Sequence, residues 1–250
     1  MWRMNDLPGD VFQAMAESLS RAEPPAITVT ELVLAVLVAA ALSIPHRSWR
    51  YFGLLATVVH ELGHAFAAVT SGQRLSGIRL RFDHSGTTTT YSRSRAAAAW
   101  SCFWGYPVPA VVGAVFVACG FNGWGPAAFG GSVLVLAASL LFLRNLAGFA
   151  ITALAIAGTL ALILLVPGEF VGHAAVILGL ALLVAAVRDV IKLAHVHLYR
   201  RERLATSDAY LLYRATAVPS VVWIVLFAAF VTGSWVVALQ PVSTILARGV

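Results

Sequence analysis

The chain has 250 residues and a net charge of +6; 60% of its residues are hydrophobic and only 11% are charged. A soluble globular protein carries about 25% charged residues, so this composition indicates a membrane protein and excludes a large soluble domain beside the spans. The positive charge comes from 16 arginines and one lysine, which we interpret as attraction to an anionic lipid leaflet, with no nucleic-acid partner.

Hydropathy windows of about 20 residues divide the chain into three parts. Residues 1–26 form a polar leader without the basic start of a signal peptide. Residues 27–239 form a transmembrane domain, and residues 240–250 form a short C-terminal tail. The seven apolar windows are 27–45, 51–71, 97–119, 127–143, 146–166, 171–187 and 215–239. The sequence therefore predicts an all-α polytopic membrane protein with about seven transmembrane helices.

The second window contains the segment HELGH, which places His60, Glu61 and His64 in an otherwise apolar helix. Side chains four residues apart share one face of a helix, so the two imidazoles can bind one metal ion. In zinc hydrolases with this pattern, the glutamate is not a ligand and exchanges protons with the metal-bound water. The alternative is a pair of hydrogen-bonded core histidines. Because charged groups inside a membrane are costly, we favour zinc bound by His60 and His64, with Glu61 as catalytic base.

The polar segment that follows, residues 72–95, has the pattern of a β-hairpin. Apolar and charged side chains alternate from Ile78 to Asp83, and a DHSG turn and a threonine-rich run ending at Tyr91 come next. The pattern predicts a short membrane-associated hairpin at about 77–91, lying against the zinc helix. Its open edge could pair with an unwound substrate by β-augmentation, or the hairpin could only plug the membrane surface. Both interpretations remain open.

The third window is interrupted by Gly105, Pro107 and Pro109. It also holds both cysteines, Cys102 and Cys119, which would be about 25 Å apart on a helix. That separation is too large for a disulfide, so the cysteines do not indicate an oxidising compartment.

The distribution of positive charge predicts an orientation. With seven alternating spans, one side receives the leader, residues 72–95, Arg144 and residues 188–214. That side holds 14 of the 17 Lys and Arg residues. The positive-inside rule then puts the N-terminus in the cytoplasm, the C-terminus outside the cell, and the HELGH motif in the cytoplasmic half of its span.

A catalytic zinc site has three protein ligands, so the motif lacks one. The remaining candidates are Asp83, Asp189, Asp208, His84, His195 and His197. Asp208 lies on the predicted cytoplasmic side, where the last span begins. Ser207 and Asp208 are also good helix N-cap residues, and this second interpretation remains equally open from the residues alone. We expect Asp189 to pair with Arg188 or Lys192.

Three features together resemble a known family: HELGH in an early span, the GYPVP interruption in the next, and SDA at the start of a late span. They are similar to the site-2 protease family of intramembrane zinc metallopeptidases, and most similar to its compact bacterial branch, the peptidase M50B-like proteins. The similarity covers about residues 47–235. It implies a multi-pass protein of a bacterial cell membrane with Zn²⁺ as cofactor. His60, His64 and Asp208 would be the zinc ligands, and Glu61 the catalytic base.

The sequence departs from the family pattern in two places. The family has Gly after its third ligand, where this chain has Ala209, and it has an Asn in the Gly-Pro segment, which GYPVPAVVG lacks. Asn145 is the candidate substitute. If Asp208 is the third ligand, its carboxylate should approach the two histidine nitrogens to within roughly 3 to 4 Å, whereas a capping role would turn it onto backbone amides.

These observations lead to the hypothesis of an intramembrane zinc metalloprotease that hydrolyses peptide bonds of membrane-embedded substrates. The first alternative is a metal-binding scaffold or sensor without proteolytic activity, in which Glu61→Gln would leave function intact. The second is a transporter, which would require inverted repeats that the sequence does not show. The expected partners are membrane-protein substrates and the lipid bilayer; the sequence identifies neither the particular substrate nor the oligomeric state.

Overall fold

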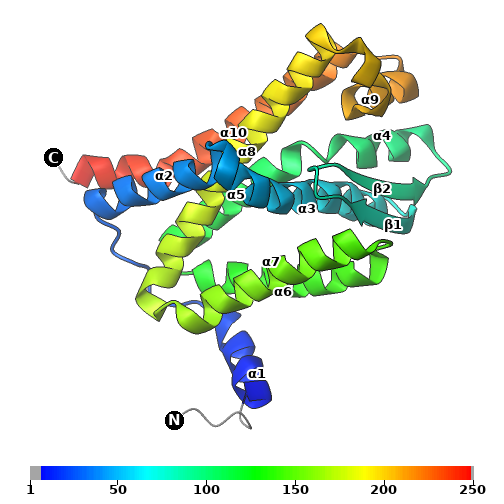
Figure 1. Ribbon diagram of the computed structural model, residues 1–250. Coiled ribbons are helices and arrows are strands. Elements are labelled where there is room, and N and C mark those ends of the chain that lie inside the picture. Colours follow the sequence, from blue (N-terminus) through cyan, green and yellow to red (C-terminus); the bar gives the residue numbers. More distant parts are fainter. Residues whose placement is uncertain (1–6, 249–250) are drawn as a thin grey trace.

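The computed structural model describes residues 7–248, which form helices and one two-stranded sheet (Figure 1). The prediction of an all-α polytopic membrane protein with a short hairpin is confirmed. The α-helices are α1 (Leu7–Ser18), α2 (Val29–Ser43), α3 (His46–Thr70), α4 (Arg95–Phe103), α5 (Pro107–Phe121), α6 (Gly125–Ser139), α7 (Leu146–Leu165), α8 (Gly168–Tyr199), α9 (Asp208–Thr216) and α10 (Ser220–Arg248). The strands are β1 (Arg74–Leu80) and β2 (Gly86–Tyr91), and two 3₁₀ helices are Leu140–Phe142 and Arg201–Thr206.

Five helical segments of the described chain are long and apolar enough to cross a bilayer: α3, Gly125–Phe142, α7, α8 and Ser220–Ser243 of α10. The pair α4 and α5, bent by 49° at its break, gives a sixth. The first predicted span corresponds to α2, which has 15 residues. A straight crossing needs about 20 residues, so α2 alone is short for one.

Two helices differ from the predicted spans in their bounds. The sixth window ends at 187, but α8 continues to Tyr199, because no proline or glycine interrupts the charged stretch after the window. The last window begins at 215, whereas α10 begins at Ser220. A left-handed residue, Ala217, and Pro219 separate α9 from α10. Proline disfavours a helical residue before it, so Asp208 opens a separate short helix and not the last span.

The antiparallel helices α5 and α8 form the centre of the bundle. Their backbones are close at two glycine pairs: a Cβ on Gly113 would lie 2.7 Å from the carbonyl oxygen of Gly179, and one on Gly120 would lie 2.6 Å from that of Gly172. Small residues allow such close packing in membranes, where no hydrophobic effect drives helices together. The two pairs hold α5, which begins at the GYPVP break, directly against α8.

The structure places the end of the leader at the opposite end of the bundle from the hairpin, whereas alternating spans would put both on one side. The amide of Ala22 donates to the carbonyl oxygen of Gly123 (2.9 Å), beyond the far end of α5 from the GYPVP break. Glu31 of α2 lies beside His173 in the first turns of α8, and Arg188, much further along α8, donates to Ser43 O. The two helices are therefore parallel.

With seven alternating spans, the leader and the loop around Gly123 would lie on opposite sides of the membrane. Their hydrogen bond puts them at the same end of the bundle, so the seven windows do not alternate in direction as predicted. The reason is that α2 is short and that α3 continues away from this end without returning beside α2 (Figure 1). The chain does not cross back between the two helices.

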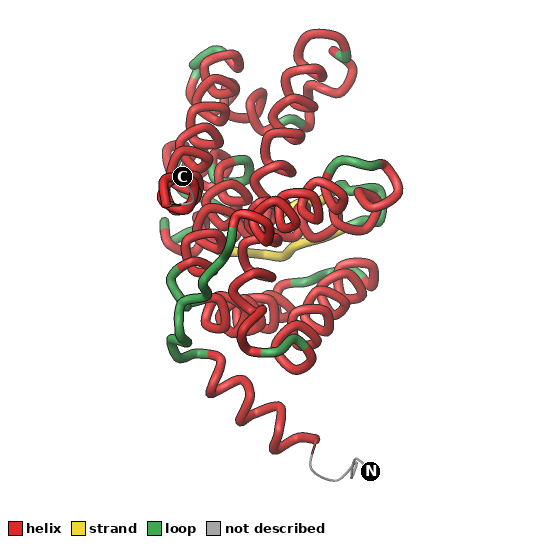
Figure 2. Tube along the Cα trace, turned by 90° about the vertical axis from the view of Figure 1, so that its left-hand side faces the viewer, coloured by secondary structure: helices red, strands yellow, loops and turns green. Residues whose placement is uncertain are grey.

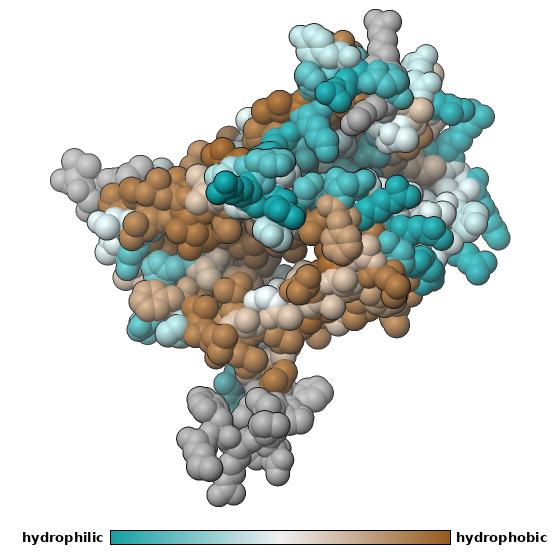
Figure 3. Space-filling model, viewed as in Figure 1, coloured by the Kyte–Doolittle hydropathy of each residue, from teal (hydrophilic) through white to brown (hydrophobic). Residues whose placement is uncertain are grey.

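The predicted hairpin is confirmed, with an antiparallel register that pairs Ile78 with Thr88 and Leu80 with Gly86. Figure 2 shows the strands among the helices of the bundle. At its tip, Asp83 Oδ1 accepts hydrogen bonds from the amide and the hydroxyl of Ser85, and these hold the pKa of the Asp83 carboxyl below its usual value. Figure 3 shows hydrophilic residues gathered around α9 and the hairpin, and apolar residues over α2, α6 and α7.

Candidate metal centre

The HELGH motif lies in the second half of α3, as its spacing predicts. The rings of His60 and His64 are edge to face, with centroids 4.8 Å apart, and their Nε2 atoms are 3.1 Å apart. His64 Nδ1 lies 2.8 Å from the carbonyl oxygen of Ser101. A carbonyl can only accept, so Nδ1 carries the proton and Nε2 presents a lone pair, the usual arrangement of a metal-binding histidine.

The break between α4 and α5 lies directly on the two histidines. A Cβ on Gly105 would be 2.4 Å from His64 Nε2, and one on Gly63 would be 2.5 Å from the carbonyl oxygen of Trp104. Only glycine fits at these two positions without displacing its neighbours. The next residue, Tyr106, packs its ring edge to face on His60, with centroids 4.9 Å apart. The break therefore supplies one wall of the site.

Asp208, the first residue of α9, completes the cluster. Its Oδ2 atom lies 3.4 Å from His60 Nε2 and 3.2 Å from His64 Nε2. Burial alone would raise the pKa of this carboxyl, but the two imidazoles outweigh burial and lower it. The N-cap of α9 is Ser207, whose hydroxyl accepts from the amide of Tyr210. The capping alternative therefore applies to Ser207, which leaves the Asp208 side chain free to face the histidines.

These three donor atoms lie within 4.8 Å of one another. A tetrahedral zinc ion with bonds of about 2.0 to 2.2 Å would space its ligands by roughly 3 to 4 Å, so the cluster fits the ion. Two imidazoles and a carboxylate leave a fourth position for water or substrate, as in catalytic zinc sites. That His60, His64 and Asp208 bind zinc stays a prediction, which this geometry supports.

The other candidate ligands have different surroundings. His84 Nε2 lies 3.2 Å from the carbonyl oxygen of Arg50, His197 bonds to Ser207, and the ring of His195 packs on Tyr199. The expected pairing of Asp189 is wrong: among the described residues it forms no ion pair. Arg188 instead donates to the carbonyl oxygens of Ser43 and Ile44 and lies over the Trp49 ring.

The Glu61 side chain packs against the hairpin. It is only 5% exposed. The Thr88 hydroxyl lies 2.7 Å from Glu61 Oε2, and a Cβ on Gly86 would lie 2.4 Å from Glu61 Oε1. In the sequence, Gly86 belongs to the DHSG turn and Thr88 to the threonine-rich run, and neither pattern indicates a contact with Glu61.

Asn145 has a structural role that the sequence did not suggest. Its amide donates to the carbonyl oxygen of Leu80 (2.7 Å) and accepts from the Leu80 amide (3.2 Å). Both groups of the side chain are thus used on the outer edge of β1. The expected substitution for the family asparagine finds no support in these contacts.

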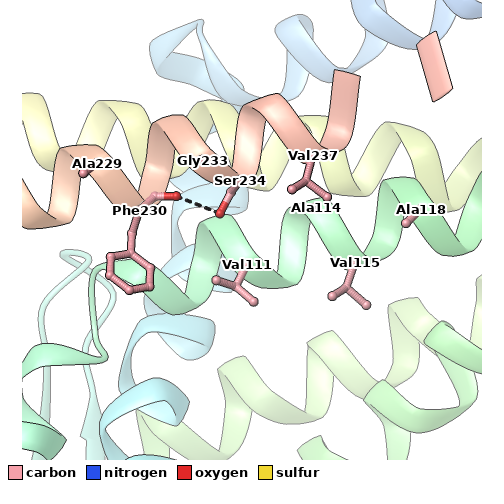
Figure 4. A pocket seen from close by; sticks show the side chains of 9 residues that line it. All are labelled: Val111, Ala114, Val115, Ala118, Ala229, Phe230, Gly233, Ser234 and Val237. Atoms are coloured by element: carbon pink, nitrogen blue, oxygen red, sulfur yellow. Dashed lines mark hydrogen bonds between the residues drawn. The ribbon is translucent and has the colours of Figure 1, made fainter. Parts of the chain in front are cut away.

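A separate cavity of about 580 Å³ lies between α5 and α10 (Figure 4). Its lining is apolar except for Ser234, whose hydroxyl donates to the carbonyl oxygen of Phe230 (2.9 Å). No titratable side chain lines it, so we assign it no part in the chemistry.

The site thus joins a helix-borne pair of histidines, the adjacent glutamate and an aspartate from a distant helix. It lies in a bundle in which five helices of the described chain, or six with the bent pair, are long and apolar enough to cross a membrane. The family model described as Peptidase M50B-like matches residues 33–238, from α2 to α10. The chain belongs to this family of peptidases. No curated protein and no solved structure matches it.

Proposed function

We propose that this protein is an intramembrane zinc metalloprotease that cleaves membrane-embedded protein substrates. The observation that carries the proposal is the convergence of His60, His64 and Asp208, whose donor atoms are 3.1 to 3.4 Å apart although 144 positions separate His64 from Asp208 in the chain. Family membership supports the peptidase activity. The transporter alternative has no structural observation in its favour.

Each group of residues in the site has a separate role in the proposed reaction. Bound zinc would polarise the scissile carbonyl and lower the pKa of water toward about 7. The Ser101 carbonyl orients His64, and Tyr106 packs against His60, so both rings are fixed before a substrate arrives. The Glu61 carboxylate accepts a proton from the attacking water and returns it to the leaving amine.

The hairpin supplies one edge to which an unwound substrate could bind. Ile78 and Leu80 bond through their backbones to Arg144 and Asn145, so the outer edge of β1 is occupied. Their cross-strand partners, Thr88 and Gly86, therefore turn their backbone groups away from β1. We infer that an unwound substrate pairs with the outer edge of β2, directly beside Glu61.

For orientation, we propose that the end with the hairpin and α9 is cytoplasmic. Without the leader, residues 72–95, Arg144 and residues 188–214 still hold 12 of the 17 Lys and Arg residues. The leader lies at the opposite end, and α10 runs toward that end, since Val237 lines the same cavity as Ala118 of α5. Reporters fused to the two termini should both report the extracytoplasmic side; reporters on opposite sides would contradict the parallel arrangement of α2 and α8.

The test of the function uses metal content and cleavage together. The purified protein should bind one zinc ion and should produce new peptide N-termini in a membrane fraction from cells that lack it. Asp208→Ala should lose most of the zinc, whereas Glu61→Gln should keep zinc and lose cleavage. Glu169→Gln, a change in the first turn of α8, is the matched control and should do neither. Cleavage that persists in Glu61→Gln would overturn the protease proposal and favour a scaffold or sensor.

A further inference from the structure

We propose that Thr88 is a positioning residue for Glu61, and that the hairpin which carries it is fixed in place for this purpose. The inference rests on the proposed function, because it assigns a role toward the general base of that reaction. It adds a residue outside the HELGH motif to the catalytic apparatus.

The contact between the two side chains is short and directional. Thr88 Oγ1 lies 2.7 Å from Glu61 Oε2 and 3.1 Å from the carbonyl oxygen of Glu61. A hydroxyl has one proton, and a carboxylate is the stronger acceptor, so the shorter bond is the one we assign. Threonine is also stiff about χ1, which limits the positions its hydroxyl can reach. One oxygen of the base is therefore held in a single place.

The neighbouring glycine leaves room for the other oxygen. A Cβ on Gly86 would lie 2.4 Å from Glu61 Oε1 and 2.7 Å from its Cδ. No L-residue could occupy this position without moving the carboxylate. Gly86 and Thr88, both on β2, thus constrain the two oxygens in different ways: the Thr88 hydroxyl bonds to one, and the other fills the space that a side chain at position 86 would take.

The strand sequence explains why Thr88 and not another threonine faces Glu61. The run from Thr87 to Thr90 alternates between exposed and half-buried, with Thr87 and Thr89 exposed. Successive side chains of a strand point to opposite faces, so only Thr88 and Thr90 can face α3. Of these, Thr88 carries the bond to Glu61. Thr89 is therefore a matched control on the same strand.

The hairpin is anchored on several sides, as a positioning element requires. The Asn145 side chain pairs with the backbone of Leu80, and the amide of Arg144 donates to the carbonyl oxygen of Ile78 (3.0 Å). At the tip, His84 Nε2 lies 3.2 Å from the carbonyl oxygen of Arg50. A mobile plug would lack these bonds to α3 and to the segment before α7. We therefore assign the hairpin to positioning and not to plugging.

The decisive experiment compares Thr88→Val, Thr88→Ser and Thr89→Val in the full-length protein, with kcat and KM measured separately. Thr88→Val keeps the shape of the threonine side chain and removes its hydroxyl. We expect kcat to fall by about tenfold, because the Glu61 carboxylate is misplaced. KM and zinc content should stay unchanged, because neither the substrate nor the metal is bound by Thr88. Thr88→Ser restores the hydroxyl and should return kcat to within about threefold of wild type. Thr89→Val should have no effect.

Three results would overturn the proposal: Thr88→Val with wild-type kcat, Thr88→Ser as impaired as Thr88→Val, or a kcat that rises in Thr88→Val, which would indicate a plug. Glu61→Gln is assayed in the same series to separate this inference from the proposed function. If Glu61→Gln is inactive and Thr88→Val is not impaired, only the positioning role fails. If Glu61→Gln cleaves like wild type, the proposed function itself fails.

A second variant tests the anchoring. Asn145→Leu removes both bonds to Leu80 and leaves the threonine in place. If the anchor acts through Thr88, Asn145→Leu should lower kcat in the same direction, and the double variant with Thr88→Val should be no worse than the poorer single variant. Full additivity of the two effects would show that Asn145 acts by another route.

Discussion

Two regions of the molecule bring histidine and carboxylate together, at opposite ends of α5. At the GYPVP end, His60 and His64 lie 3.2 to 3.4 Å from Asp208. At the other end, His173 Nε2 lies 3.7 Å from Glu31 Oε2. Among the described residues, neither ring nitrogen of His173 forms a hydrogen bond. Glu31 is instead engaged in a capping box with Thr28 at the start of α2.

The difference shows what a metal centre needs beyond the right residue types. The first region has two imidazoles on one helix face, a carbonyl that sets the tautomer of one of them, and a carboxylate whose Oδ2 lies within 3.4 Å of both rings. The second has one imidazole and a carboxylate whose Oε2 already accepts from the amide of Thr28 (2.8 Å). A His–Glu contact in a membrane protein is therefore not a zinc site by itself.

The largest effect that would test this comparison is the loss of metal. His60→Ala removes one of three ligands and should abolish stoichiometric zinc, as measured by elemental analysis of the purified protein. His173→Ala should leave the zinc content at that of wild type. Equal loss in both variants would mean that the regions are not distinct in function.

The second effect is steric and smaller. Gly105→Ala introduces a methyl group 2.4 Å from His64 Nε2, so the break must move or the ring must turn. We expect zinc affinity to fall by about 10- to 100-fold, the range typical of mutations in residues that orient a metal ligand. Gly158→Ala in α7 is the matched control, because its new methyl group meets no atom within 4 Å. Competition with a chromophoric chelator measures both; unchanged affinity in Gly105→Ala would show that the break does not hold the ligands.

How far the sequence predicts this site depends on the range of each interaction. The spacing of His60 and His64 is a local property of one helix, so the pair could be identified from five residues. Asp208 required family resemblance, because 144 residues separate it from His64 and its neighbour Ser207 hides it among capping signals. Thr88 acts through a side-chain hydrogen bond to Glu61, and Gly105 acts through the close approach of its backbone to His64. Both contacts join segments that are separate in the chain, and no pattern in the sequence carries that information.

The fold, too, could be predicted only where it depends on local sequence. Apolar windows located every long helix, since hydropathy is summed over a local segment. They could not give the direction of α2, because its parallel alignment with α8 is set by contacts such as that of Pro25 with Gly172, between residues far apart in the chain. The assumption that each window reverses direction then put the leader at the wrong end of the bundle.

The smallest expected effect concerns the second region. Thr28→Ala removes the hydroxyl that accepts from the Glu31 amide (3.3 Å) and donates to Glu31 Oε2 (2.8 Å). Loss of an N-cap costs about 1 kcal/mol, which in a chain of this size lowers Tm by about 2 to 4 °C. Zinc content and kcat should not change, because the cap lies at the far end of α5 from the metal centre. Thermal unfolding in detergent measures the shift, with Thr28→Ser as the control that keeps the hydroxyl. A loss of zinc in Thr28→Ala at unchanged Tm would break the comparison, since it would couple two regions that share no residue.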